Sequence, residues 1–170
     1  MAMYGANGYK HVEKDGITAI IIHGSKVLLL KRRNIPLLIN RGIWAFLSGS
    51  LDRGEGRLEA AYREIKEEVG IADRDLMLLL ETEETLKDDR KMISWSNGVF
   101  VFRSRTSSVR LDLENSAYRW ASLGDIVHHT GYTNVFINES HIVNRLRVFL
   151  NVRHVAEGKT GQRIQGFRRP

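Results

Sequence analysis

The chain has 170 residues, of which 42% are hydrophobic and 27% charged, which indicates one globular domain with a tail and excludes a disordered chain. It contains no cysteine, which excludes a disulfide framework, a thiolate metal site and a cysteine nucleophile. The net charge is +6. Residues 153–170 contain five basic residues and one acid, so the basic balance belongs mainly to this terminal segment.

No segment of the sequence predicts membrane insertion. The first fifteen residues lack the apolar stretch of a secretory signal. The longest apolar runs, at 17–22 and 27–30, are far shorter than the roughly 18 residues that span a bilayer. We therefore expect a soluble, cytoplasmic protein without a membrane partner.

Apolar runs and turn residues divide the first half of the chain into short elements. Residues 1–15 are polar and are predicted to form a flexible arm or an edge segment. Two β-branched runs, 17–23 and 26–32, are separated by Gly24 and Ser25 and predict a hairpin. A loop and a short strand are expected next, over residues 34–42 and 43–51.

The second half of the chain contains helical and strand patterns around a charged turn at 87–91. Helical periodicity over 57–69 ends at Gly70, a residue suited to the position after a helix. The other predicted elements are strands at 76–84, 92–103 and 119–122 and helices at 123–129 and 138–151. Residues 158–170 lack periodicity and are expected to be disordered. We predict an α/β fold, a mixed sandwich, with segments at 1–15, 16–152 and 153–170.

The predicted helix at 57–69 carries the most informative pattern in the chain. On a helical wheel its apolar residues form one stripe, made of Leu58, Ala61, Ile65 and Val69. Glu64, Glu67 and Glu68 stand at positions i, i+3 and i+4 on a neighbouring face. These carboxylates repel one another unless a cation neutralises them, and their hard oxygen atoms suit Mg²⁺ or Mn²⁺. The alternative is a solvated acidic helix face.

The residues around this acidic cluster form a longer motif. Gly49 is followed after five residues by Glu55, and after seven more by Arg63-Glu64-Ile65-Lys66-Glu67-Glu68-Val69-Gly70-Ile71. All nine specified positions match the Nudix box. The sequence therefore resembles the Nudix hydrolase family over residues 16 to about 152, which implies the mixed-sheet α/β/α sandwich of that family.

The resemblance implies a role for each position of the box. The ligands of a divalent cofactor, Mg²⁺ or Mn²⁺, would be Glu64, Glu67, Glu68 and a backbone carbonyl at Gly49. Arg63 would lie close to Glu55 and orient the carboxylates. Gly54 fits the tight loop before the helix. Leu47-Ser48 stands where the family usually has Pro-Gly, which would alter the backbone beside one metal ligand.

A later glutamate completes the implied chemistry. Glu114 precedes Trp120 by six residues, which is similar to the family segment that supplies another metal ligand or a general base; the alternative is an exposed loop residue. A bound divalent cation neutralises a pyrophosphate group and lowers the pKa of bound water. Either Glu64 or Glu114 would accept the proton of that water during cleavage of a phosphoanhydride.

Weaker signals favour a nucleoside triphosphate substrate, cleaved to monophosphate and pyrophosphate. Arg33, Phe46 and Asn138 are placed similarly to base-binding residues of the 8-oxo-dGTP pyrophosphohydrolase type. Each has a structural alternative, because Arg33 suits a surface charge and Phe46 suits a core aromatic. Asn138 suits the capping of a helix N-terminus, which is the favoured alternative.

Other substrate classes and roles stay open. Lys87 occupies the position where ADP-ribose hydrolases have a proline, and no tyrosine marks a diadenosine polyphosphate hydrolase. The alternatives are an ADP-ribose or nucleotide-sugar pyrophosphatase, or a non-catalytic nucleotide- or RNA-binding protein. The basic tail is the one feature that would bind nucleic acid, and a homodimer is compatible with the sequence. His128 and His129 are adjacent and are expected to cap a helix or lie on the surface.

Overall fold

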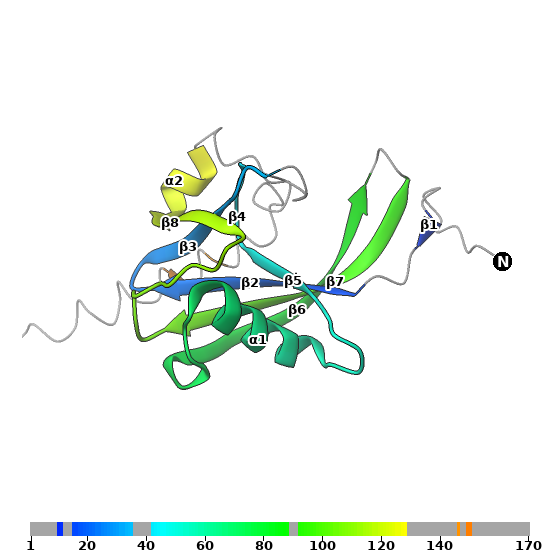
Figure 1. The fold of residues 1–170 in the computed structure, drawn as a ribbon, viewed down its shortest axis with the longest axis horizontal. Coiled ribbons are helices and arrows are strands. Elements are labelled where there is room, and N and C mark those ends of the chain that lie inside the picture. Colours follow the sequence, from blue (N-terminus) through cyan, green and yellow to red (C-terminus); the bar gives the residue numbers. More distant parts are fainter. Residues whose placement is uncertain are drawn as a thin grey trace, which may run out of the picture.

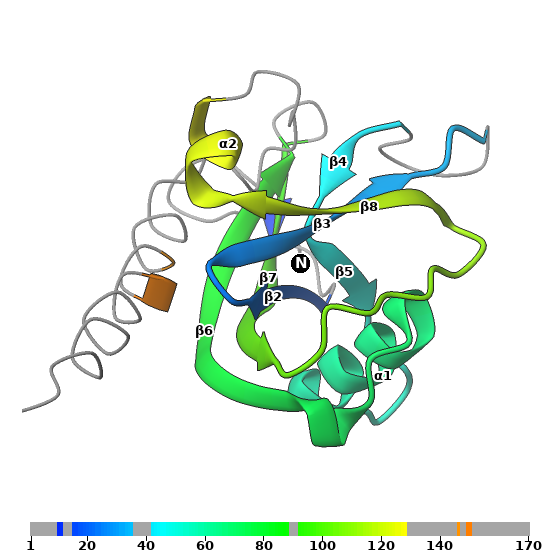
Figure 2. The same ribbon diagram turned by 90° about the vertical axis from the view of Figure 1, so that its left-hand side faces the viewer.

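A mixed β-sheet with a helix on each side forms the protein (Figures 1 and 2). The computed structural model describes residues 10–11, 15–35, 42–88, 92–128, 146 and 149–150. Strand β2, Gly16–His23, lies parallel to β7, Ile93–Ser104, and antiparallel strands extend the sheet from both. The predicted α/β sandwich is confirmed. No helix in the described part of the chain is long and apolar enough to cross a membrane.

The predicted N-terminal hairpin is confirmed. Strands β2 and β3, Lys26–Arg32, are antiparallel and meet at Gly24, whose φ of 60° suits a glycine turn. Only the two residue pairs next to the turn are paired between these strands. Beyond them the strands separate, so that β2 pairs with β5 and β7 while β3 pairs with β4 and β8.

The single strand predicted at 43–51 is wrong, because the chain forms two strands there. Strand β4, Trp44–Ala45, pairs with β3, whereas β5, Leu47–Ser50, pairs with β2. Between them, Phe46 is buried in the core. The chain therefore changes strand partner at a core aromatic residue, which the alternating pattern alone did not reveal.

The second hairpin is longer than predicted. Strand β6, Leu76–Asp88, pairs with β7 along its whole length and includes the first residues of the expected charged turn. Strand β8, Asn115–Ser122, begins four residues before the predicted strand, at polar residues that carry no apolar signal. Both extensions follow from backbone pairing, which is independent of the side-chain pattern. In Figure 1 the end of the β6–β7 hairpin projects away from the helices.

Short elements complete the described chain. Strand β1, Lys10–His11, pairs with β7, as expected if this part of the N-terminal arm is an edge segment. A 3₁₀ turn, Asp73–Asp75, connects α1 to β6, and α2 spans Leu123–His128.

Two apolar clusters fill the space on either side of the sheet. Helix α1, Arg57–Val69, buries Ala61, Ile65 and Val69 against one face, which confirms the predicted stripe. The other face packs against α2 and against Leu146 and Leu150. These two residues belong to the segment 138–151, for which the sequence predicts a helix, whereas Asn138, His129 and residues 153–170 lie outside the described residues.

Candidate active site

Helix α1 begins and ends at glycines that fix its position. At its start, the Gly56 N–H donates to Glu59 Oε2 at 2.9 Å. At its end, Gly70 adopts φ 69° and its N–H donates to the Lys66 carbonyl at 3.1 Å. Both ends are therefore hydrogen-bonded, and the glycine expected at the C-terminus is confirmed.

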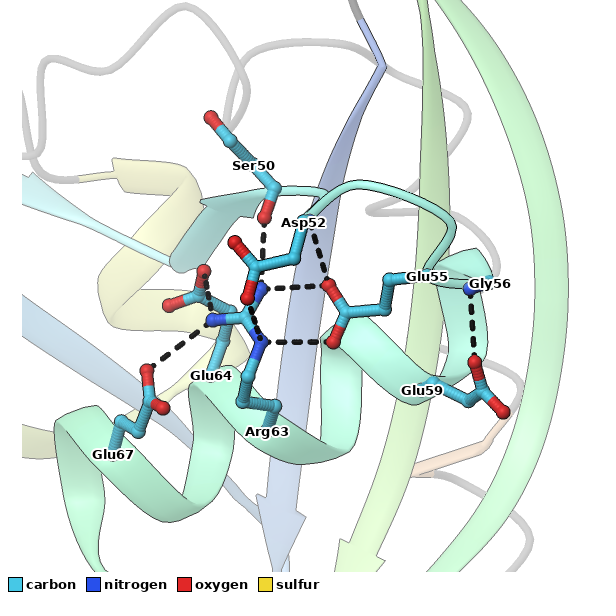
Figure 3. Close-up of polar contacts among 8 residues, drawn as sticks. All are labelled: Ser50, Asp52, Glu55, Gly56, Glu59, Arg63, Glu64 and Glu67. Carbon is cyan, nitrogen blue, oxygen red and sulfur yellow. Dashed lines mark hydrogen bonds and ion pairs between the residues drawn. The ribbon is translucent and has the colours of Figure 1, made fainter.

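Arg63 holds the loop that precedes the helix. Its Nε and Nη2 donate to the two oxygens of Glu55 at 2.8 and 2.9 Å, and Nη2 also donates to the Ser50 carbonyl at 2.9 Å (Figure 3). The Asp52 N–H donates to Glu55 at 2.9 Å. The bond from Arg63, followed by that from Asp52, lowers the pKa of Glu55 to about 2. Arg63 and Glu55 thus lie together, as the box implies.

Arg63 also contacts two of the predicted metal ligands. Its Nη1 donates to Glu64 Oε1 at 3.0 Å and to Glu67 Oε2 at 3.2 Å (Figure 3). We call Arg63 with Glu55, Glu64 and Glu67 the Arg63 cluster. The guanidinium of this side chain, which is 25% exposed, therefore orients three carboxylates, and the Glu55 bonds raise the pKa of Arg63.

Glu64 lies directly over the backbone of Gly49. A Cβ atom at Gly49 would overlap the Glu64 carboxyl group, so only glycine permits this approach. Gly49 itself is held by pairing with Ile17 in β2. Burial raises the pKa of Glu64, against the opposing effect of Arg63. The end of β5 and the face of α1 therefore bring the Gly49 backbone and the Glu64 carboxylate together.

Glu68 is the most buried of the three predicted ligands. Its residue exposure is 8%, and burial raises its pKa to about 7. The Asn115 amide donates to Glu68 Oε2 at 2.9 Å and to Asp112 Oδ1 at 3.0 Å. The sequence did not single out Asn115, because one asparagine before a strand has no distinguishing pattern. The structure adds it as the residue that orients Glu68.

Glu114 lies near the same carboxylates, at the start of β8. Its Oε2 accepts a bond from Arg32 Nη1 at 3.0 Å, and its charge contributes to the raised pKa of Glu64. Its side chain remains 52% exposed. The structure thus brings Glu114 to the group formed by Glu64 and Glu68, and it also brings Arg32, which the sequence analysis did not select.

The structure does not bring the three predicted base-binding residues together within the part of the chain that it describes. Phe46 is 4% exposed and belongs to the core cluster, which supports its structural alternative. Arg33 donates from Nη2 to the Asn115 carbonyl at 3.3 Å and from its N–H to the Glu114 carbonyl at 2.8 Å. The third residue, Asn138, lies outside the described residues. A shared nucleotide-binding role for the three stays a prediction.

The donor set suits a hard divalent cation, although its side chains are turned toward Arg63. Within the described residues, no three acidic or histidine side chains are already arranged to hold a metal ion. Glu64 and Glu67 instead bond the guanidinium. Carboxylate and carbonyl oxygens are the ligands that Mg²⁺ prefers, and the buried Glu68 carboxyl lacks a direct cationic partner within the described residues. The residues present therefore fit the implied metal.

Comparison with known proteins supports the motif. The NUDIX domain family model matches residues 13–137. An RNA pyrophosphohydrolase of Francisella tularensis is 28% identical over 140 residues, which cover 71% of this chain and 88% of that protein. One from Psychrobacter cryohalolentis is 43% identical over 81 residues, covering 45% of this chain and 43% of that protein. The nucleoside triphosphatase NudI of Escherichia coli is 31% identical over 98 residues, covering 52% and 67%.

A solved structure shows the same fold. The Ap4A hydrolase of C. elegans, in a binary complex, superposes with a TM-score of 0.62 at 20% identity, over 85% of this chain and 98% of that one. At this identity the likeness concerns the fold alone. The family-model match, which covers most of the chain, and the arrangement of the box around Arg63 together make this chain a member of the Nudix hydrolase family.

Proposed function

We propose that this Nudix hydrolase is a divalent-metal-dependent enzyme that cleaves a nucleoside triphosphate to monophosphate and pyrophosphate. The observation that best supports this proposal is the Arg63 cluster beside Gly49, which gathers carboxylates that would otherwise repel one another. A protein that only binds nucleotides has no need to retain such a group. The non-catalytic alternative is therefore less favoured by the site.

The metal would be held by the carboxylates of α1 and by the adjacent backbone. The residues concerned are Glu64, Glu67, Glu68 and the Gly49 carbonyl, with Glu114 nearby. Mg²⁺ or Mn²⁺ bound there would neutralise phosphate charge and lower the pKa of a bound water. Arg63 holds Glu64 and Glu67 in position, and Asn115 holds Glu68.

The chain offers two acceptors for the proton of the attacking water. Glu64 is half-buried and bonded to Arg63, whereas Glu114 is half-exposed and bonded to Arg32. The charge of Glu114 contributes to the raised pKa of Glu64, so the two carboxylates lie close together. Because Glu64 is a proposed metal ligand, Glu114 also lies close to the proposed reaction site. A single-turnover comparison of Glu64→Gln with Glu114→Gln identifies the base as the residue whose loss slows the chemical step more at saturating metal.

The names of two relatives bear on the substrate class. NudI is named a nucleoside triphosphatase, and the Francisella protein, matched over 140 residues, is named an RNA pyrophosphohydrolase. Free nucleoside triphosphates are our first candidate. The second candidate is the 5′-triphosphate end of RNA, favoured by the long match to the Francisella protein.

A substrate panel tests this assignment. Ribo- and deoxyribonucleoside triphosphates, a 5′-triphosphorylated RNA and ADP-ribose are incubated with Mg²⁺ or Mn²⁺, and phosphate and pyrophosphate release are measured. Glu67→Gln protein serves as the control for contaminating hydrolases. We expect pyrophosphate release from a triphosphate. An ADP-ribose kcat/KM that exceeds every triphosphate by about tenfold would overturn the proposed substrate class.

A further inference from the structure

Arg32 and Glu114 form an ion pair at the edge of the candidate active site. Arg32 Nη1 donates to Glu114 Oε2 at 3.0 Å, across a sequence separation of 82 residues. The arginine side chain is 25% exposed and the glutamate 52%. Both charged groups are therefore accessible to a small anion from solvent.

The backbone on each side of this pair is fixed. The Arg32 N–H donates to the Ile43 carbonyl at 3.1 Å, and its own carbonyl accepts from Gly42 at 3.0 Å. The Arg33 N–H donates to the Glu114 carbonyl at 2.8 Å. A change of partner at Arg32 or Glu114 would thus require only side-chain rotation, because the main chain is already held.

The guanidinium of Arg32 acts on the proposed metal ligands as well. Its partner Glu114 directly precedes Asn115, whose amide donates to Glu68 Oε2 at 2.9 Å. The charge of Arg32 opposes the burial that raises the pKa of Glu68. Arg32, the last residue of β3, is thus a cation close to the proposed metal ligand Glu68. An anionic substrate bound at these carboxylates through a metal would lie next to it.

We propose that Arg32 binds a phosphate group of the substrate and gives up its ion pair with Glu114 to do so. A planar guanidinium matches phosphate oxygens with two parallel donors, whereas Glu114 accepts only one bond from it here. Glu114 is then an internal competitor for Arg32 in the free protein. Phosphate binding releases its carboxylate for the role that the proposed function gives it, on which this inference rests.

Binding of inorganic tripolyphosphate in metal-free buffer tests the exchange by isothermal titration calorimetry. Arg32→Ala is expected to weaken binding about tenfold, because a charge-assisted phosphate contact is lost. Glu114→Gln is expected to tighten binding roughly two- to fivefold, the equivalent of releasing one exposed ion pair. The double variant should bind like Arg32→Ala alone.

The double variant separates the exchange from a general charge effect. Removal of any nearby carboxylate reduces repulsion of an anion, and that gain would be the same with or without Arg32. An equal gain in both backgrounds, no gain from Glu114→Gln, or wild-type affinity in Arg32→Ala would each overturn the proposal. No measurable binding by Glu114→Gln protein would also contradict it.

Two further variants guard against trivial explanations. Arg74→Ala removes one positive charge that is 87% exposed and paired with Asp75, and it should bind tripolyphosphate like the wild type. Arg32→Lys keeps the charge without the fork, so about two- to fivefold weaker binding is expected even if the alanine variant fails to fold. Unchanged binding by Arg32→Lys would overturn the proposal. The assay needs no turnover, so a failed substrate panel and a failed exchange give different results.

Discussion

Two arginines of helix α1 hold carboxylates in different surroundings. Arg63 pairs with Glu55 and Glu64, whose side chains are 14% and 15% exposed. Arg57 pairs with Asp15 at 2.7 Å and Glu83 at 3.2 Å, both more than half exposed. It also donates to Ser96, which in turn bonds Glu83. We call these four residues the Arg57 cluster.

The two clusters differ in role, because one belongs to the candidate metal site and the other only attaches α1 to the sheet. The Arg57 cluster joins the first residue of α1 to the segment before β2 and to the β6–β7 hairpin. The Arg63 cluster lies over the end of β5, where Glu64 meets Gly49. The same ion-pair chemistry therefore attaches the helix to the sheet at one end and gathers candidate metal ligands farther along it.

Substitution of the exposed glutamate in each cluster should give the greatest difference in activity. Glu67 and Glu83 each pair with an arginine at 3.2 Å and are each 60% exposed. Glu67→Gln should lower kcat by about 10²–10³-fold because a ligand of the proposed metal is lost. Glu83→Gln should leave kcat nearly unchanged. Metal-free thermal unfolding should show that both variants fold, and equal kcat losses would break the comparison.

Substitution of Arg63 or Arg57 by alanine should give a smaller difference in activity. Arg63→Ala leaves the partly buried Glu55 without its partner and frees Glu64 and Glu67, so activity should fall roughly 10- to 100-fold. Arg57→Ala removes ion pairs with exposed carboxylates and should lower the free energy of unfolding by at most about 1 kcal/mol. Steady-state kinetics and urea unfolding of both variants measure the two effects. A larger activity loss in Arg57→Ala would reverse the roles assigned to the clusters.

Glycine substitutions sharpen the role of Gly49. Gly49→Ala places a Cβ against the Glu64 carboxyl group and should displace it, lowering activity and destabilising the fold by about 1–3 kcal/mol. Gly124→Ala is the matched control, because its Cβ would meet only Ser122 Oγ at 3.7 Å within α2. That variant should unfold at the wild-type temperature or slightly above it. Full activity in Gly49→Ala would mean that the close approach is dispensable.

The smallest expected effect is a pH dependence of stability. Arg63 lowers the pKa of Glu55 from 4.5 to about 2, so the folded state favours the ionised carboxyl. The resulting stabilisation is fully present above pH 4.5 and is lost as the pH falls toward 2. The difference in unfolding free energy between wild type and Glu55→Gln should therefore shrink over this range. A difference that stays constant with pH would contradict the assigned ion pair.

The sequence predicted the helix of the box and its neighbours well. Residues 57–69 and Gly70 were placed correctly, because an amphipathic stripe and a glycine stop are local signals. The box also implied that Arg63 lies beside Glu55. These features depend on residues close together in the chain.

Long-range pairing was less predictable. The division of 43–51 into β4 and β5 depends on two different partner strands, and the extension of β8 to Asn115 depends on backbone bonds to β3. Neither leaves a side-chain pattern. The contacts of Arg32 and Asn115 join β3 and β8 to the carboxylates across long separations, so only the folded arrangement identifies them.

If the Arg63 cluster contributes to a divalent-metal site, loss of one of its carboxylates should weaken metal binding. Mn²⁺ affinity, measured by electron paramagnetic resonance of the free ion, tests it without any substrate. We expect wild type and Glu83→Gln to bind Mn²⁺ equally, whereas Glu67→Gln should bind it at least about tenfold more weakly. Equal affinity in all three proteins, or no binding in any of them, would contradict it.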